Sequence, residues 1–169
     1  AAKYLDAQPV IGIDPLSERL SHSVSLGATS TICSRETDPI EAVADLTGGR
    51  MADIVVEAVG HRDQALNLCI DLCRKYGKIL YFGVPPETID GIRWRDMLVK
   101  NLSVHTSIHP DFDRDFPLAM QWIGEGRVDL TNLITHRYPV AEIQQAFETF
   151  GQRVEGALKV LVDFPEAGA

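Results

Sequence analysis

An aspartate at the end of a short apolar run is the side chain of this sequence best suited to bind a small molecule. The run Val10-Ile11-Gly12-Ile13 ends at Asp14, and a segment with a helical pattern follows it. A strand that is buried on both faces is continuously hydrophobic rather than alternating. A carboxylate at the carboxyl end of such a strand accepts hydrogen bonds from both ribose hydroxyls of an adenine dinucleotide. We predict that Asp14 binds this ribose; the alternative is an aspartate that only starts the turn before Pro15.

Two further segments lie where buried strands are predicted to end. Ala58, Val59 and Gly60 close a strand over 52–58, and residues 82–84 close a strand over 78–82. In an open α/β sheet, ligands bind outside the carboxyl ends of the strands, at the point where the strand order reverses. We therefore expect both segments to line the same ligand site. For Gly60, a simple turn into the next helix is an equally good interpretation.

The histidines and cysteines show no pattern of a metal or redox site. Cys69 and Cys73 are four residues apart, a spacing that fits neither the usual zinc motifs nor the C-x-x-C redox motif. Together with Cys33 they are predicted to be buried free thiols, which favours a reducing cytoplasm as the location. Five histidines form no H-x-x-x-H pair or carboxylate cluster and are expected to be surface or packing residues: His22, His61, His105, His109 and His136.

The composition excludes two classes of partner. The 169 residues carry a formal net charge of −8 with a pI near 5.0, so no basic face is available for nucleic acid. No apolar stretch approaches the twenty or so residues needed to cross a membrane. Hydrophobic content of 45% with 24% charged residues is typical of a soluble globular protein with one core, or one domain and part of another.

Short buried strands alternate with amphipathic helices along the first two thirds of the chain. Such alternation predicts parallel pairing with right-handed crossovers, hence a doubly wound α/β sheet of the Rossmann type. Ser17 is the expected N-cap of the first helix and Gly27 its C-terminal stop. The predicted strands are 9–14, 29–33, 52–58, 78–82 and 102–107, and the predicted helices are 17–26, 39–47, 62–74 and 94–99.

The pattern changes after Ser107. Helices are predicted at 115–125 and 140–150, with extended segments at 133–138 and 158–164. We therefore expect a dinucleotide-binding domain over 1–108 and a separate C-terminal segment over 109–169.

Read together and in order, these segments resemble the medium-chain, zinc-type alcohol and polyol dehydrogenase family over all 169 residues. The matching stretches include Val10–Asp14, Leu26–Thr29, Gly48-Gly49, Ala52–Gly60, Gly77–Leu80, Gly83–Pro86, Leu133–Pro139, Ala146–Glu148 and Lys159-Val160. The resemblance implies that the chain is the coenzyme domain followed by a segment that returns to a second, GroES-like catalytic domain. The front half of the family, with its zinc ligands, first strand and glycine turn, has no counterpart in this sequence.

The lack of a first strand raises a physical objection to the chain as a complete domain. The glycine turn G-x-G-x-x-G lies about twenty residues before the acidic residue of such a unit, whereas thirteen residues precede Asp14. In the strand order 3-2-1-4-5-6, the first strand pairs with both 10–14 and 54–57. Each buried backbone group left without a partner costs on the order of 1–3 kcal/mol. We therefore expect the native protein to be longer at its amino terminus; the alternative is a smaller, differently ordered sheet.

The resemblance also implies roles for individual residues in binding NAD. Arg19 occupies the family position that touches the adenosine ribose, although alone it could be a solvated helix residue, and a nearby arginine is one way to tolerate NADP. Lys159 aligns with the basic residue near the pyrophosphate, or is a solvent-facing lysine of an edge strand. Glu57, buried at a strand end, should have a partner, and the candidates are the cofactor and the absent domain. The remaining implied contacts are the backbone of Ala58, Val59 and Gly60, of Phe82, Gly83 and Val84, and the strand-end residues Thr106 and Ile108.

The sequence thus predicts an NAD-dependent, zinc-type dehydrogenase acting on an alcohol or carbonyl compound, with NADP less favoured because Asp14 repels a 2′-phosphate. Zinc and all catalytic residues are expected outside this sequence, and the chain alone should be inactive. The alternatives are a zinc-free NADPH-dependent quinone or enoyl reductase and a non-catalytic dinucleotide-binding protein. An exposed edge strand at 102–107, with Leu102 and Val104, predicts a homodimer or homotetramer.

Overall fold

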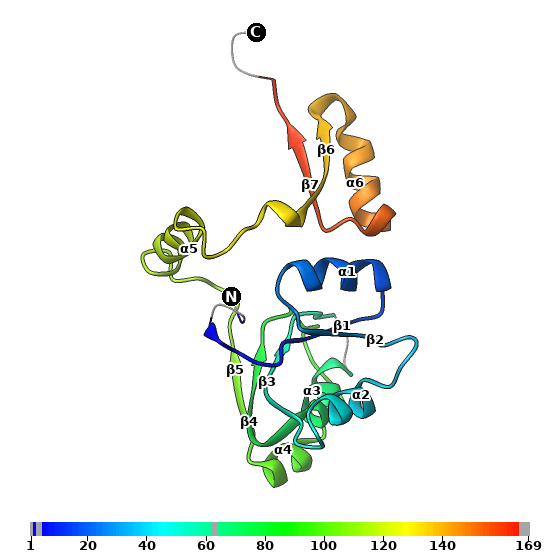
Figure 1. Cartoon of the computed structure of the whole chain (residues 1–169), viewed down its shortest axis with the longest axis vertical. Helices are drawn as coiled ribbons and strands as arrows, with labels where there is room; N and C mark the ends of the chain where they lie inside the picture. Colours follow the sequence, from blue (N-terminus) through cyan, green and yellow to red (C-terminus); the bar gives the residue numbers. More distant parts are fainter. Residues whose placement is uncertain (1, 3–4, 62–63, 166–169) are drawn as a thin grey trace. The chain divides into compact units, whose positions relative to one another are not determined.

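The computed structural model describes residues 2, 5–61 and 64–165, and these form two compact units (Figure 1). The first unit, here called the discontinuous unit, comprises residues 1–36 and 118–169. The second, here called the central unit, comprises residues 37–117. Contacts within the chain define these two units. The boundary between a dinucleotide-binding domain over 1–108 and a C-terminal segment over 109–169 stays a prediction.

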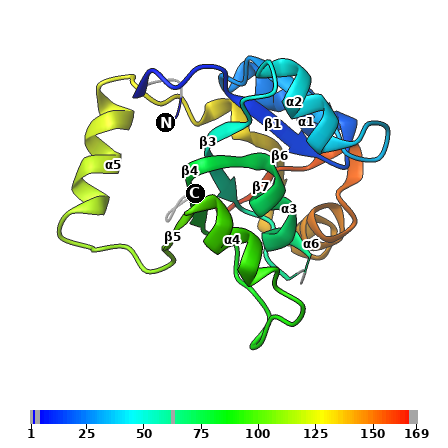
Figure 2. The ribbon, with the colours of Figure 1, turned by 90° about the horizontal axis from the view of Figure 1, so that it is seen from below.

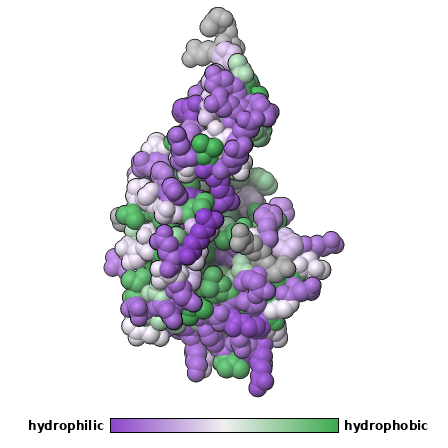
Figure 3. Space-filling model, turned by 90° about the vertical axis from the view of Figure 1, so that its right-hand side faces the viewer, coloured by the Kyte–Doolittle hydropathy of each residue, from purple (hydrophilic) through white to green (hydrophobic). Residues whose placement is uncertain are grey.

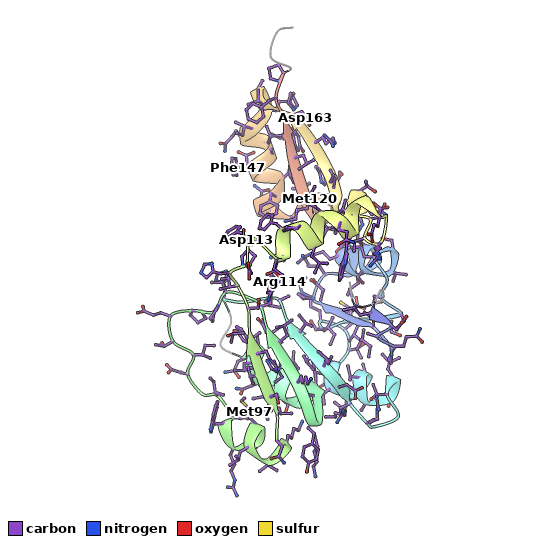
Figure 4. The ribbon with its side chains drawn as sticks, turned by 90° about the vertical axis from the view of Figure 1, so that its left-hand side faces the viewer. Met97, Asp113, Arg114, Met120, Phe147 and Asp163 are labelled. Atoms are coloured by element: carbon purple, nitrogen blue, oxygen red, sulfur yellow. The ribbon has the colours of Figure 1, made fainter. Side chains whose placement is uncertain are left out.

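The central unit is a three-stranded parallel sheet with helices between its strands (Figure 1). Its strands are β3 (Ala52–Glu57), β4 (Cys73–Tyr81) and β5 (Ser103–Thr106), in the order β3-β4-β5. Its helices are α2 (Pro39–Leu46), α3 (Ala65–Leu72) and α4 (Trp94–Lys100). The core lies where α3 and α4 pack on β4, and it includes Ile70, Cys73, Ile79 and Met97, the last labelled in Figure 4.

Hydrogen bonds from side chains define the start of α2 and the end of α3. Asp38 precedes α2, and its carboxylate accepts hydrogen bonds from the N–H groups of Ile40 and Glu41. Helix α3 was predicted to run to Arg74, but it ends at Leu72 and β4 already begins at Cys73. Lys100 stabilises this end because its Nζ donates hydrogen bonds to carbonyl oxygens of the last turn and of Cys73. Positions 62–63 of the predicted helix lie outside the described residues.

The first part of the discontinuous unit is a parallel strand pair with one helix. Strand β1 (Ile11–Asp14) pairs with β2 (Ser30–Cys33), and α1 (Ser17–Ser25) connects them. The prediction that Ser17 caps α1 was wrong, because Leu16 holds the N-cap position and no side chain caps it. Gly27 ends the helix as predicted, with a φ of 107° that glycine adopts without steric cost.

The second part of the discontinuous unit pairs β6 (Ile134–Pro139) with β7 (Lys159–Asp163), again in parallel. Helix α6 (Ile143–Gln152) packs on this pair through Ala146 and Thr149, whose hydroxyl lies 2.9 Å from that of Tyr138. The segment 140–150 was predicted to be one helix. It begins with a 3-10 turn at Val140–Glu142, and α6 follows. Helix α5 (Asp115–Gly124), drawn in yellow-green in Figure 2, has no buried residue.

The observed pairing confirms the predicted parallel α/β class. Among the described strands, none pairs with both β1 and β3, the position that the Rossmann order gives to its first strand. The surface drawn in Figure 3 is largely hydrophilic with scattered apolar side chains. Within the described residues, every helix is too short or too polar to cross a bilayer.

Candidate dinucleotide-binding site

The carboxylate of Asp14 is oriented at the carboxyl end of β1 by two neighbours. Its Oδ1 accepts a hydrogen bond from the N–H of Leu16 at 2.9 Å, and its Oδ2 lies 3.2 Å from Nη1 of Arg19. The side chain of Asp14 is 23% exposed and that of Arg19 is 35% exposed. Each carboxylate oxygen can accept a second hydrogen bond. Asp14 is therefore accessible, held in place and able to accept two hydroxyl groups.

Arg19 is brought to Asp14 by the first turn of α1. The ion pair places a guanidinium within reach of any group that Asp14 binds. An arginine in this position is the feature that accommodates a 2′-phosphate in NADP-binding proteins. The ion pair therefore combines a carboxylate of the kind that favours NAD with a guanidinium of the kind that tolerates NADP.

The segments 58–60 and 82–84 are held together where β3 and β4 end, at the carboxyl ends of these parallel strands. The N–H groups of Phe82 and Gly83 donate to the carbonyl oxygen of Glu57 at 2.9 and 3.0 Å. The N–H of His61 donates to the carbonyl oxygen of Val84 at 2.9 Å. The structure thus brings together two of the three predicted strand ends through backbone hydrogen bonds.

Glycine is required at both positions of closest approach. Gly60 has a φ of 61°, and a Cβ there would lie 2.4 Å from the carbonyl oxygen of Val84. A Cβ at Gly83 would lie 2.3 Å from the backbone nitrogen of Gly60. Gly60 is therefore more than a helix-entry turn. Around these glycines Val59, Phe82 and Val84 expose apolar side chains that a planar ring could cover.

The other predicted contacts are distributed over both units. Thr106 ends β5 opposite Tyr81 of β4, and Ile108 follows it with an exposed side chain. Because β3, β4 and β5 are parallel, these residues follow the carboxyl ends of the strands, as Gly60 and Gly83 do. Lys159 begins β7 in the discontinuous unit and is exposed there.

Glu57 is the residue of this site that the sequence indicated only in part. It was predicted to be buried, with the cofactor or the absent domain as its candidate partner, and it is 2% exposed. Its Oε1 accepts hydrogen bonds from the N–H groups of Val59 and Gly60, both at 2.9 Å. The partner is thus the turn that follows Glu57 itself, which the strand-end position alone could not reveal.

A concave region of about 380 Å³ lies within the discontinuous unit and was not predicted. Its polar lining includes His22 of α1, Thr131 and Asn132 of the 3-10 turn Thr131–Leu133, His136 of β6 and Glu155. These residues are far apart in sequence, so no local spacing signals the region. Among the residues that the structure describes, no group of three His, Cys, Asp or Glu side chains could hold a metal ion.

The buried thiols are unsuited to nucleophilic chemistry. Burial, with smaller contributions from the nearby Glu57 and Cys73, raises the pKa of Cys69 to about 12. Burial also raises the pKa of Cys73. Both thiols therefore stay protonated near neutral pH, as expected for packing residues.

Comparisons with known proteins agree with this arrangement of elements. The L-threonine 3-dehydrogenase of Bacillus subtilis is 30% identical over 149 residues, covering 87% of this chain and 42% of that protein. The sorbitol dehydrogenase of the same species is 26% identical, covering 96% of this chain and 45% of that protein. The chain therefore spans less than half the length of these curated relatives.

A solved structure and a family profile complete the comparison. The alcohol dehydrogenase of Thermotoga maritima is 30% identical with a TM-score of 0.82, covering 97% of this chain and 45% of that structure. Residues 1–125 match the family described as zinc-binding dehydrogenase. The chain belongs to the zinc-binding dehydrogenase family, in agreement with the resemblance found in its sequence.

Proposed function

We propose that the protein to which this chain belongs is an NAD-dependent oxidoreductase that converts an alcohol or polyol into a carbonyl compound. The observation that carries the proposal is the oriented, accessible carboxylate of Asp14 at the carboxyl end of a parallel strand. Relatives named as threonine, sorbitol and alcohol dehydrogenases support the reaction class.

The residues present fit a dinucleotide. Asp14 would accept both hydroxyls of the adenosine ribose, and Arg19 would keep that carboxylate in place. The backbone at Gly60 and Gly83 approaches so closely that a Cβ on either residue would collide, and the backbone of these two segments would contact the nicotinamide and its ribose. Thr106, Ile108 and Lys159 are proposed as further contacts. The nicotinamide ring, when bound, supplies the hydride acceptor.

We favour NAD over NADP because an ionised Asp14 repels a 2′-phosphate at the position of the ribose hydroxyls. Arg19 offsets part of this repulsion. It is the one observation that favours the second candidate, an NADPH-dependent quinone or enoyl reductase without zinc. A dinucleotide-binding protein without catalysis would bind NAD but oxidise no alcohol.

The family description implies zinc, but the described residues do not fit a zinc site. We propose that the catalytic residues and any metal ligands lie in the part of the protein that corresponds to the uncovered portion of its relatives, and that this chain alone does not turn over an alcohol.

We further propose a cytoplasmic protein whose subunits pair through β5. This strand lies at the edge of its sheet, and all four of its residues are exposed. Unpaired strand edges invite pairing with another chain.

The proposal is tested by turnover of the protein produced from its complete gene. Secondary alcohols, polyols and L-threonine are offered with NAD or NADP, with and without added zinc, and reduced nicotinamide is followed by absorbance. We expect reduction of NAD by at least one of these alcohols. Dinucleotide binding without turnover on any alcohol or carbonyl would support the non-catalytic alternative, and preferential use of NADPH on quinones would support the reductase.

A further inference from the structure

We propose that Glu57 is a positioning residue that fixes the turn Val59-Gly60 against Gly83 and so shapes the surface that receives the nicotinamide half of the dinucleotide. The inference rests on the proposed function and extends it to a residue whose side chain is bonded to the protein's own backbone. All of the observations that carry it lie within the central unit.

The side chain of Glu57 bends back onto its own chain. Its Oε1 accepts the N–H groups of Val59 and Gly60, both at 2.9 Å, so one oxygen orders two successive peptide groups. A carboxylate that accepts two backbone hydrogen bonds holds them more strongly than a neutral acceptor does. The turn after β3 is thereby defined by a side chain rather than by backbone pairing alone.

The main chain of the same residue fixes the neighbouring segment. The carbonyl oxygen of Glu57 accepts the N–H groups of Phe82 and Gly83. One residue therefore connects the turn after β3 with the segment after β4, the two segments predicted to line the nicotinamide site.

The second carboxylate oxygen of Glu57 lies in a crowded, buried position. Oε2 of Glu57 is buried and has no hydrogen-bond partner among the described residues. A Cβ at Gly83 would lie only 2.4 Å from it. A buried acceptor without a partner costs stability, and this cost at a strand end facing a binding surface points to a positioning role rather than to packing alone.

Replacing Glu57 by glutamine or by alanine separates the effect of its charge from the effect of its side-chain length. Glutamine keeps the length and one acceptor oxygen but removes the charge and turns an amide NH₂ toward the crowded glycine. Alanine removes both hydrogen bonds to the turn. Asp53 supplies a matched control because it is an acidic residue on the same strand, at the opposite end, where it pairs with Arg50 and Arg74.

The experiment compares Glu57→Gln, Glu57→Ala and Asp53→Asn in the protein produced from its complete gene. Dinucleotide affinity is measured by NADH fluorescence, KM and kcat by turnover, and folding by thermal unfolding. We expect Glu57→Gln to weaken dinucleotide binding about tenfold, with KM raised more than kcat is lowered, and Glu57→Ala to weaken it further. Asp53→Asn should leave affinity unchanged even where it lowers the unfolding temperature.

Amide hydrogen exchange at Val59 and Gly60 gives a readout that does not depend on a cofactor. We expect exchange at both amides to accelerate at least about tenfold in Glu57→Gln, and not in Asp53→Asn. Wild-type affinity in Glu57→Gln, or an equal loss in Asp53→Asn, would overturn the positioning role while the proposed function stands. If the wild-type protein binds no nicotinamide dinucleotide, the proposed function fails; unchanged exchange would then refute the role of Glu57 in the turn, and accelerated exchange would uphold it.

Discussion

At the scale of single residues, the carboxylates of Asp14 and Glu57 have different tasks in the proposed site. Asp14 is accessible and has capacity to accept further hydrogen bonds, which suits a ligand-binding group. Glu57 is buried and occupied by the turn that follows it, which suits a group that shapes the site. Sequence position predicted the first of these from the apolar run before it, but it could not distinguish the second from a contact to a cofactor.

Replacing Asp14 by asparagine should reduce discrimination against NADP. The amide oxygen can still accept the N–H of Leu16, whereas the charge that repels a 2′-phosphate is lost. We expect NAD affinity to fall about 10- to 100-fold, and the NAD-to-NADP preference to fall by a similar factor. Titration with both reduced dinucleotides checks this result. Glu18→Gln, an exposed neighbour in α1, is the matched control and should change neither affinity; an equal effect would refute the assignment.

The buried thiol of Cys69 predicts a loss of stability at alkaline pH. Burial raises its pKa from 9.0 to about 12 in the folded protein, so the folded state retains the proton more strongly than the unfolded chain. Its contribution to stability is complete below pH 9 and is lost between pH 9 and 12, by about 1.4 kcal/mol per pH unit. Denaturant unfolding of the wild type and of Cys69→Ala isolates this term. Identical pH slopes in the two proteins would contradict it.

At the scale of elements, the sequence predicted the strands and helices that surround the site, and its largest error lies at the boundary between α3 and β4. The pattern of apolar residues and glycines located β1, β3 and β5 because these signals are local. The end of α3 depends instead on Lys100, which lies 27 residues after Cys73 and donates to its carbonyl oxygen. Long-range capping of this kind has no local signal, so the predicted helix extended into β4.

The capping role of Lys100 predicts a loss of stability on truncation. Lys100→Met keeps the apolar stem but removes three hydrogen bonds to carbonyl oxygens at the end of α3. We expect the free energy of unfolding to fall by about 1–3 kcal/mol, measured by urea denaturation. Lys75→Met, at an exposed lysine of β4, should cost less than about 0.5 kcal/mol. Equal effects of the two substitutions would show that Lys100 does not stabilise the helix end.

At the scale of the whole molecule, the residues predicted for one cofactor are distributed over the three parallel sheets that the structure describes. Asp14 and Arg19 belong to the discontinuous unit, and Gly60 and Gly83 belong to the central unit. The sequence indicated this separation, because in the Rossmann order a first strand joins the strands that carry Asp14 and Glu57. The polar region around His22 and His136 was not predicted, since only the folded chain brings α1 and β6 together.

The exposed edge at β5 predicts a subunit interface. Val104→Lys places a charge on the edge strand, and charged edges resist pairing. We expect the wild-type protein from its complete gene to be dimeric or tetrameric by light scattering, and Val104→Lys to be monomeric or much weaker in association. Thr88→Lys adds the same charge in an exposed loop and should leave the oligomer intact. A monomeric wild type would contradict the interface.

A crystal structure of the protein with NAD bound tests most directly whether Asp14 binds the adenosine ribose. The account predicts both hydroxyls of the adenosine ribose within about 2.5–3.0 Å of the Asp14 carboxylate, and the nicotinamide half against the backbone of Gly60 and Gly83. A ribose bound elsewhere, with Asp14 contacting only Leu16 and Arg19, would contradict it.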